Sequence, residues 1–155
     1  MSAFESLLAE FSEKTGMTFA QARDGSVSLE ADGVYMTVQS REARGDVLFF
    51  SFPFGDLEPE AATMEKALAL AAHGLGTDGF YLGISGDAFV LSGTMPLEGA
   101  SAEDLANRLL SLAATTGKVE KALARAFAEH AQAEVEREER QVNPGSDGNF
   151  SMIQV

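Results

Sequence analysis

Apolar residues spaced three and four positions apart open the chain and predict an amphipathic helix. Ser2 and Glu5 have the spacing of a capping box, in which each side chain accepts a hydrogen bond from a backbone N–H of the first turn. Gly16 supplies the left-handed residue that commonly ends a helix. The apolar face of this first helix consists of Phe4, Leu7, Leu8 and Phe11.

A period of two replaces the helical spacing between residues 17 and 53, and it predicts strands at about 26–30, 34–39 and 47–52. Asp32-Gly33 predicts a tight hairpin, because this pair readily adopts positive φ. The run from Val47 to Phe52 is apolar on both faces, so we expect a helix to cover one face and a partner or ligand to cover the other. The three strands predict an antiparallel meander.

Helical spacing returns over residues 57–74, with Pro59 in the first turn. Two further strands, at 80–85 and 88–92, form a predicted hairpin around Gly86-Asp87. The apolar stripe of the second helix consists of Met64, Leu68, Ala71 and Leu75.

A last helix begins at Ser101, with Asp104 as its capping partner. Its apolar stripe is interrupted at residues 115–117, and residues 134–140 are almost entirely charged. An unbroken helix to Arg140 would be about 60 Å long at ~1.5 Å per residue. A helix of that length exceeds a domain of this size, so we expect it to bend near Gly117, to overhang, or to pack on a second subunit.

The element order is therefore helix, three strands, helix, two strands, helix. Segregated strands and helices joined by hairpins predict an α+β fold, with an antiparallel sheet and helices packed on it. We expect one domain over residues 1–142, with a charged helical extension from about residue 131. Residues 143–155 are rich in Gly, Ser and Asn and predict a mobile tail.

Composition narrows the range of partners. The 155 residues include 24 acidic and 11 basic ones, which gives a formal net charge of −13. Such a field repels phosphate groups, so we expect neither nucleic acid nor an anionic membrane surface as a partner. No basic residue precedes Lys14 and no apolar run approaches the ~20 residues of a membrane span, so we expect a cytoplasmic protein without membrane insertion.

The chain offers little for catalysis. It has no cysteine, and its two histidines, His73 and His130, lie on different predicted helices. His130 and Glu134 have the spacing of a possible metal pair, but such pairs are more often solvated. Gly83-Ile84-Ser85-Gly86 leads into another strand and not into the helix that a nucleophile elbow needs. We therefore expect no enzyme activity, no cofactor and no bound metal.

Apolar surface remains as the candidate functional feature. A one-sided sheet would leave several large side chains on its outer face, and Tyr35 and Tyr81 add two aromatics. Two interpretations stay open. Either that face is covered within the chain or by a homodimer, or it is a docking surface for an extended apolar segment.

At this point the sequence resembles the class I type III secretion chaperones, the Tir chaperone (CesT-like) family. The likeness rests on the element order over residues 2–130, the opening Phe4 to Phe11 helix, and the Leu48-Phe49-Phe50 strand. The most specific stretch runs from Tyr81 to Ser92 and is completed by Met95-Pro96-Leu97.

The resemblance implies a cytoplasmic homodimer that binds the N-terminal region of a secreted effector in extended form and keeps it secretion-competent. It implies a dimer interface formed by Met64, Leu68, Tyr81 and Leu82. It implies effector grooves around Phe4, Leu8, Phe11, Val34, Met36 and Phe49. A related binding or regulatory protein of the same fold, similar to YbjN and without a role in secretion, is the alternative.

Overall fold

The computed structural model describes residues 1–55, 61–72 and 78–142, apart from the side chains at positions 62, 70 and 130. The predicted first turn of the second helix, His73 and the predicted mobile tail therefore lie outside the described residues. By its internal contacts the chain divides into residues 1–122 and residues 123–155, and each unit is described by itself.

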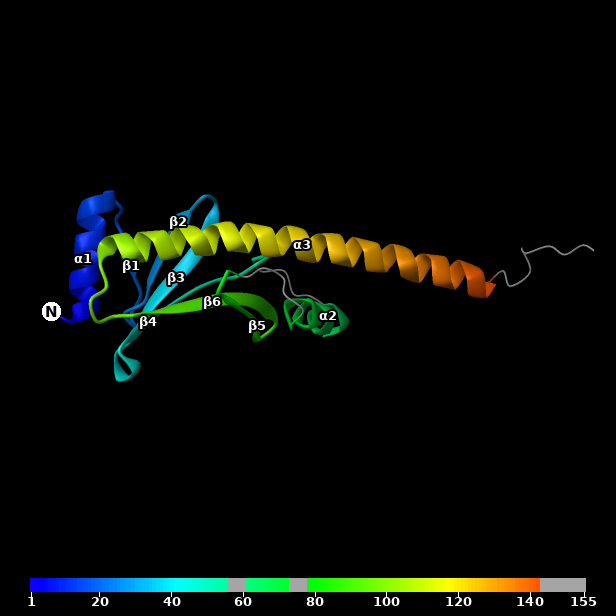
Figure 1. The fold of residues 1–155 in the computed structure, drawn as a ribbon, viewed down its shortest axis with the longest axis horizontal. Coiled ribbons are helices and arrows are strands. Elements are labelled where there is room, and N and C mark those ends of the chain that lie inside the picture. Colours follow the sequence, from blue (N-terminus) through cyan, green and yellow to red (C-terminus); the bar gives the residue numbers. More distant parts are fainter. Residues whose placement is uncertain (56–60, 73–77, 143–155) are drawn as a thin grey trace, which may run out of the picture. The chain divides into compact units, whose positions relative to one another are not determined.

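An antiparallel sheet of six strands forms the centre of the first unit (Figure 1). Its strands lie in the order β1-β2-β3-β4-β6-β5, with consecutive strands adjacent except at the β4–β6 pair. Their bounds are β1 Ala20–Gln21, β2 Val27–Ala31, β3 Val34–Arg41, β4 Asp46–Ser51, β5 Tyr81–Ser85 and β6 Ala88–Pro96. The predicted α+β fold is confirmed, and two-residue β1 adds an edge strand to the predicted meander.

Two short turns connect the strands β2, β3 and β4. Asp32 and Gly33 both have positive φ, at 52° and 76°, and join β2 to β3 as a tight hairpin. A short 3₁₀ helix, η1 (Glu42–Arg44), joins β3 to β4. Of these two turns, the Asp32-Gly33 hairpin is the one that the sequence predicted.

Within the described residues, four helical segments accompany the sheet: α1 (Ala3–Thr15), η1, α2 (Ala61–Ala72) and α3 (Ala102–Val142). The predicted capping box of α1 is present, because Ser2 Oγ accepts from the Glu5 N–H and Glu5 Oε2 accepts from the Ser2 N–H. Gly16 ends α1 in the left-handed conformation. Ser101 and Asp104 make the corresponding pair at the start of α3.

Alternate strand residues form the core, on the sheet face that α1 and the first part of α3 cover (Figure 1). On β4, Val47, Phe49 and Ser51 are fully buried, whereas Leu48 and Phe50 point to the other face and are half-buried. The helices contribute two further sets of buried side chains. These are Phe4, Leu7, Leu8 and Phe11 from α1, and Leu105, Leu109, Leu112 and Val119 from α3.

Gly93 of β6 marks the tightest packing in this core. A Cβ at this position would lie 2.6 Å from Phe49 Cε2 and 2.7 Å from Phe80 Cδ1. The two phenylalanine rings meet edge to face, with centroids 6.0 Å apart, directly over the glycine. Two aromatic rings therefore occupy the space that any side chain at position 93 would need.

The last helix continues through Gly117 without interruption, over 41 residues. A single glycine destabilises a helix by only about 1 kcal/mol relative to alanine. The burial of the helix residues on both sides of Gly117 outweighs this cost. Side chains from Ala131 to Val142 are all exposed. Within the second unit, Arg125–Glu129 and Arg140–Glu136 pair along the helix at the spacing of one turn.

Among the described residues, no helix combines the length and the apolar character that crossing a bilayer requires.

Candidate partner-binding surfaces

An open groove lies between α1 and the β1 edge of the sheet, with a volume of about 560 Å³. Leu8 and Ala9 of α1 form one wall, and Met17 and Phe19 of the segment leading into β1 form the other. Phe19 is held in place by Phe11, since the two ring centroids are 5.5 Å apart. Several polar side chains, including Glu5 and Glu13, stand at the rim, so the groove combines an apolar floor with an acidic border.

The residues predicted to contact an effector lie mostly inside the chain. Phe4, Phe11, Met36 and Phe49 are between 0% and 4% exposed, because they face the helix-covered side of the sheet or the sheet-facing side of α1. Leu8 is 8% exposed and still lines the α1–β1 groove. Val34 is half-buried and lines a different pocket at the end of β4. The structure therefore does not gather these six residues on one surface.

The uncovered face of the sheet presents a different set. Phe49 belongs to the β4 run that the sequence shows as apolar on both faces, and it lies on the covered face, where it is fully buried. Tyr35, at 74% exposure, and Phe52, at 42%, are the large exposed residues toward the β3–β4 side. Phe50 stacks edge to face on Phe52, with centroids 5.6 Å apart. Because a strand apolar on both faces carries no parity signal, the sequence did not distinguish these two sets.

A second groove, of about 460 Å³, lies between α2 and β5. It brings together Leu68, Tyr81 and Leu82, three of the four residues predicted for the dimer interface. Leu68 is 38% exposed and Tyr81 76% exposed, which leaves large apolar groups open to solvent. Met64, the fourth residue, is half-buried on α2 and does not line the groove.

A third pocket, of about 370 Å³, lies where β4 ends. The sequence did not indicate this pocket, because its lining residues come from three segments far apart in the chain: the β2–β3 hairpin, the residues that follow β4, and α3. Two hydrogen bonds fix its walls: Ser51 Oγ lies 2.6 Å from Thr116 Oγ1, and the Phe54 N–H donates to Glu120 Oε1 at 2.8 Å. We call it the β4-exit pocket, and it is lined by Gly33, Val34, Tyr35, Phe52, Gly55, Thr116 and Glu120.

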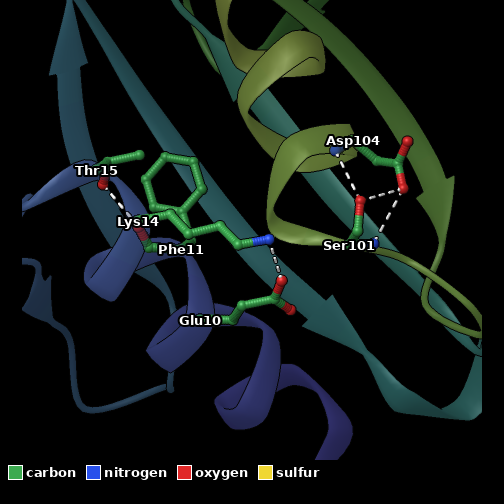
Figure 2. A network of polar contacts seen from close by, with 6 residues as sticks. All are labelled: Glu10, Phe11, Lys14, Thr15, Ser101 and Asp104. Carbon is green, nitrogen blue, oxygen red and sulfur yellow. Dashed lines mark hydrogen bonds and ion pairs between the residues drawn. The ribbon is translucent and has the colours of Figure 1, made fainter.

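Polar contacts at the ends of α1 and α3 are local and structural (Figure 2). Lys14 Nζ lies 2.7 Å from Glu10 Oε1, which raises the pKa of Lys14. The Ser101 hydroxyl and N–H both donate to Asp104, which lowers the pKa of that carboxyl. Each shift follows from a capping or one-turn contact, so these groups set helix ends and do not converge on a site.

The part of the chain that the structure describes holds no cluster of metal-binding side chains. Within it, no three His, Asp or Glu side chains gather closely enough to hold a metal ion. The best-formed ion pair, Arg41–Asp46, joins neighbouring residues of β3 and β4 through two hydrogen bonds of 2.8 and 2.6 Å. This carboxylate and this guanidinium are therefore committed to each other.

Family comparison gives this geometry its context. Residues 6–119 match the Tir chaperone protein (CesT) family, a span that begins in α1 and ends in α3. The chain belongs to this family. It is therefore a member of a chaperone family and not of an enzyme family. No curated protein sequence matches the chain.

Solved structures of the same fold include chaperones captured with their partners. The HopA1–SchA chaperone–effector complex contains a chain with a TM-score of 0.61 and 21% identity, covering 77% of this chain and 94% of that one. The ExsC–ExsE complex contains one with a TM-score of 0.62 and 19% identity, covering 77% and 92%. YbjN from E. coli, described as a putative transcription regulator, matches with a TM-score of 0.56 and 17% identity, covering 79% and 93%. At these identities the structures establish the fold.

Proposed function

We propose that this protein is a cytoplasmic chaperone that binds the N-terminal region of a type III secreted effector in extended form. In this role it keeps the effector soluble and competent for secretion. The observation that carries the proposal is the match of residues 6–119 to the Tir chaperone family. Two open grooves lined in part by large apolar side chains agree with a role in binding.

The α1–β1 groove suits an extended guest. Leu8 and Phe19 make its opposite walls apolar, and β1 beside it is an edge strand of only two residues. An extended segment placed there would bury alternate side chains in the groove and pair its backbone with the sheet edge. Coupled ordering of a segment in this way buries much apolar area and offsets the entropy that the segment loses.

The α2–β5 groove suits a second copy of the chain. Leu68 and Tyr81 leave apolar area exposed along a helix and a sheet edge, and a twofold axis would place the same patch of each copy against the other. A homodimer of this kind would also bury Leu82 and extend the cover over Met64. It would leave the α1–β1 groove, at the opposite edge of the sheet, open for cargo.

The alternative function is a binding or regulatory role without secretion, as for a YbjN-like protein. The observation that favours it is the fold similarity to YbjN, with a TM-score of 0.56. The two functions differ in the partner, since only the first requires an exported polypeptide.

Co-expression with the product of a neighbouring gene, followed by co-purification and mass measurement, tests the proposal. A complex of two chaperone chains with one effector segment is the expected result. In the variant Ala9→Arg, a large charge enters the α1–β1 groove from an exposed helix position, and the complex should be lost. Ala114→Arg places the same charge at an exposed position of α3 outside the grooves and should leave the complex intact. Equal behaviour of the two variants would remove the groove from the proposal.

A further inference from the structure

The β4-exit pocket is a small, well-walled site separate from the two grooves used above. Its volume is about 370 Å³. Tyr35 and Phe52 contribute aromatic rings, and Glu120 of α3 contributes a carboxylate. The pocket lies wholly within the first unit of the chain, residues 1–122.

Hydrogen bonds hold the walls of the pocket in place without a ligand. Thr116 and Glu120 are one turn apart on α3, and they bind Ser51 and the Phe54 N–H respectively. The loop between is a tight turn, in which the Gly55 N–H donates to the Phe52 carbonyl at 2.9 Å. Phe54 adopts a left-handed φ of 65°, a strained conformation for a bulky residue that these contacts maintain. The backbone at Phe52 and the carboxylate of Glu120 are therefore held in place at the same pocket.

The charge of Glu120 is not neutralised inside the described part of the chain. Oε1 accepts the Phe54 N–H, and within residues 1–55, 61–72 and 78–142 no cation forms an ion pair with this carboxylate. Lys118, two positions before Glu120 on α3, forms an ion pair with Asp78 at 3.1 Å. A half-buried carboxylate in a pocket that Tyr35 and Phe52 also line thus keeps one oxygen available for a cation.

We propose that the β4-exit pocket binds the guanidinium group of an arginine side chain on a bound polypeptide. A cation over an aromatic ring gains from the negative face of the ring, and a carboxylate at the same site adds charge-assisted hydrogen bonds. A planar guanidinium satisfies both at once, because it stacks on a ring while donating from its edge. The net charge of −13 disfavours an anionic group at the same place and attracts a basic segment.

This inference rests on the proposed function only in that the arginine belongs to bound cargo. The pocket itself is testable without cargo. The probe is N-acetyl-arginine amide, and the comparison compound is N-acetyl-citrulline amide, which has nearly the same shape and no charge. The readout is the change in backbone amide chemical shifts on titration of ¹⁵N-labelled full-length protein.

The expected result is a saturable shift of the Gly33, Gly55 and Thr116 amides with the arginine compound and not with the citrulline compound. Glu120→Gln should weaken the arginine response by about fivefold, because it removes the charge while its amide oxygen still accepts the Phe54 N–H. Glu42→Gln, an exposed carboxylate on η1 outside the pocket, should leave the response unchanged.

Equal responses to the two compounds, or an unchanged response in Glu120→Gln, would overturn the inference. Chemical-shift changes that spread over the acidic surface and weaken equally in Glu120→Gln and Glu42→Gln would also overturn it. Such changes would indicate a general attraction between the positive compound and the negative protein. Amide dispersion of each variant confirms that it is folded. If the pocket does not bind the arginine compound, the proposal that the protein binds an effector still stands. If the pocket binds arginine but no effector co-purifies, only the proposed function is contradicted.

Discussion

The hydroxyl of Ser51 and the hydroxyl of Thr116 lie 2.6 Å apart in the core, although 65 positions separate them in the sequence. Thr116 Oγ1 also donates to the Leu112 carbonyl at 2.7 Å. A hydroxyl has one hydrogen, so Ser51 must be the donor between the two side chains. This chain of two bonds joins the end of β4 to α3.

Breaking that contact from one side should destabilise the protein more than removing it altogether. Thr116→Val should leave the Ser51 hydroxyl buried without an acceptor and lower the free energy of unfolding by about 1–3 kcal/mol. The double variant Ser51→Ala/Thr116→Val should recover part of that loss, because no unpaired polar group remains. Urea unfolding of the wild type, both single variants and the double variant measures the coupling. Additive effects would contradict the contact.

Gly93 should not tolerate a side chain. Gly93→Ala should lower the free energy of unfolding by about 1–3 kcal/mol, because its Cβ would meet the Phe49 and Phe80 rings closer than 3 Å. Gly83→Ala is the matched control in the neighbouring strand, where the new Cβ would lie 3.7 Å from Val90 Cγ1, an ordinary contact. Thermal unfolding of the two variants should separate them clearly, and equal melting temperatures would refute the packing argument.

Lowering the pH should destabilise the protein by protonating Asp46, which pairs with Arg41 between β3 and β4. Two hydrogen bonds from Arg41 hold the pKa of the Asp46 carboxyl below its usual value. A depressed carboxyl pKa contributes stability that is present above the unfolded-state pKa of about 3.9 and is lost as pH falls through the folded-state value. Asp46→Asn should therefore reduce the loss of stability between pH 7 and about pH 3.

Unfolding free energies of wild type and Asp46→Asn, measured by urea across that pH range, check this expectation. Asp87→Asn, an exposed carboxyl in the β5–β6 turn, is the control substitution. Parallel pH profiles for wild type and Asp46→Asn would show that the Arg41 contact does not contribute.

Charge on the α2–β5 surface should separate the proposed dimer. Leu68→Glu should convert dimer to monomer in sedimentation equilibrium, because a carboxylate would be buried against the same patch of the second copy. Leu110→Glu introduces the same change at a leucine of α3 that is 52% exposed and lies outside the α2–β5 groove. A monomeric wild type, or a dimer that survives Leu68→Glu, would remove this surface from the assembly.

Features encoded within a few neighbouring residues could be predicted from the sequence. The Ser2–Glu5 capping box and the Asp32-Gly33 hairpin each depend on side chains and φ angles a few positions apart, and both are present. β1 was not predicted, because Ala20–Gln21 is too short to show a period of two. Its existence depends on pairing with β2.

The candidate site was harder to predict, for two physical reasons. The burial of Phe49 could not be predicted, since a strand with apolar residues on both faces leaves the direction of each side chain undetermined. The β4-exit pocket depends on Glu120 reaching a backbone N–H 66 positions away. No local pattern encodes such a contact. In contrast, Leu68 and Tyr81 line one groove together, and it was the resemblance to the chaperone family that implied this pairing.

The two-residue length of β1 has a consequence for how the protein behaves when no guest is present. An open sheet edge recruits any strand that fits, including one from another copy, and the end point of such growth is a fibril. Here the pairing at β1 ends after two residues, and the next strand carries Glu30 on the side opposite the core. Copies that each carry a net charge of −13 repel one another, whereas a basic guest is attracted. The β1 edge therefore disfavours pairing with another copy of the chain. A concentrated sample without cargo should stay free of ordered aggregates.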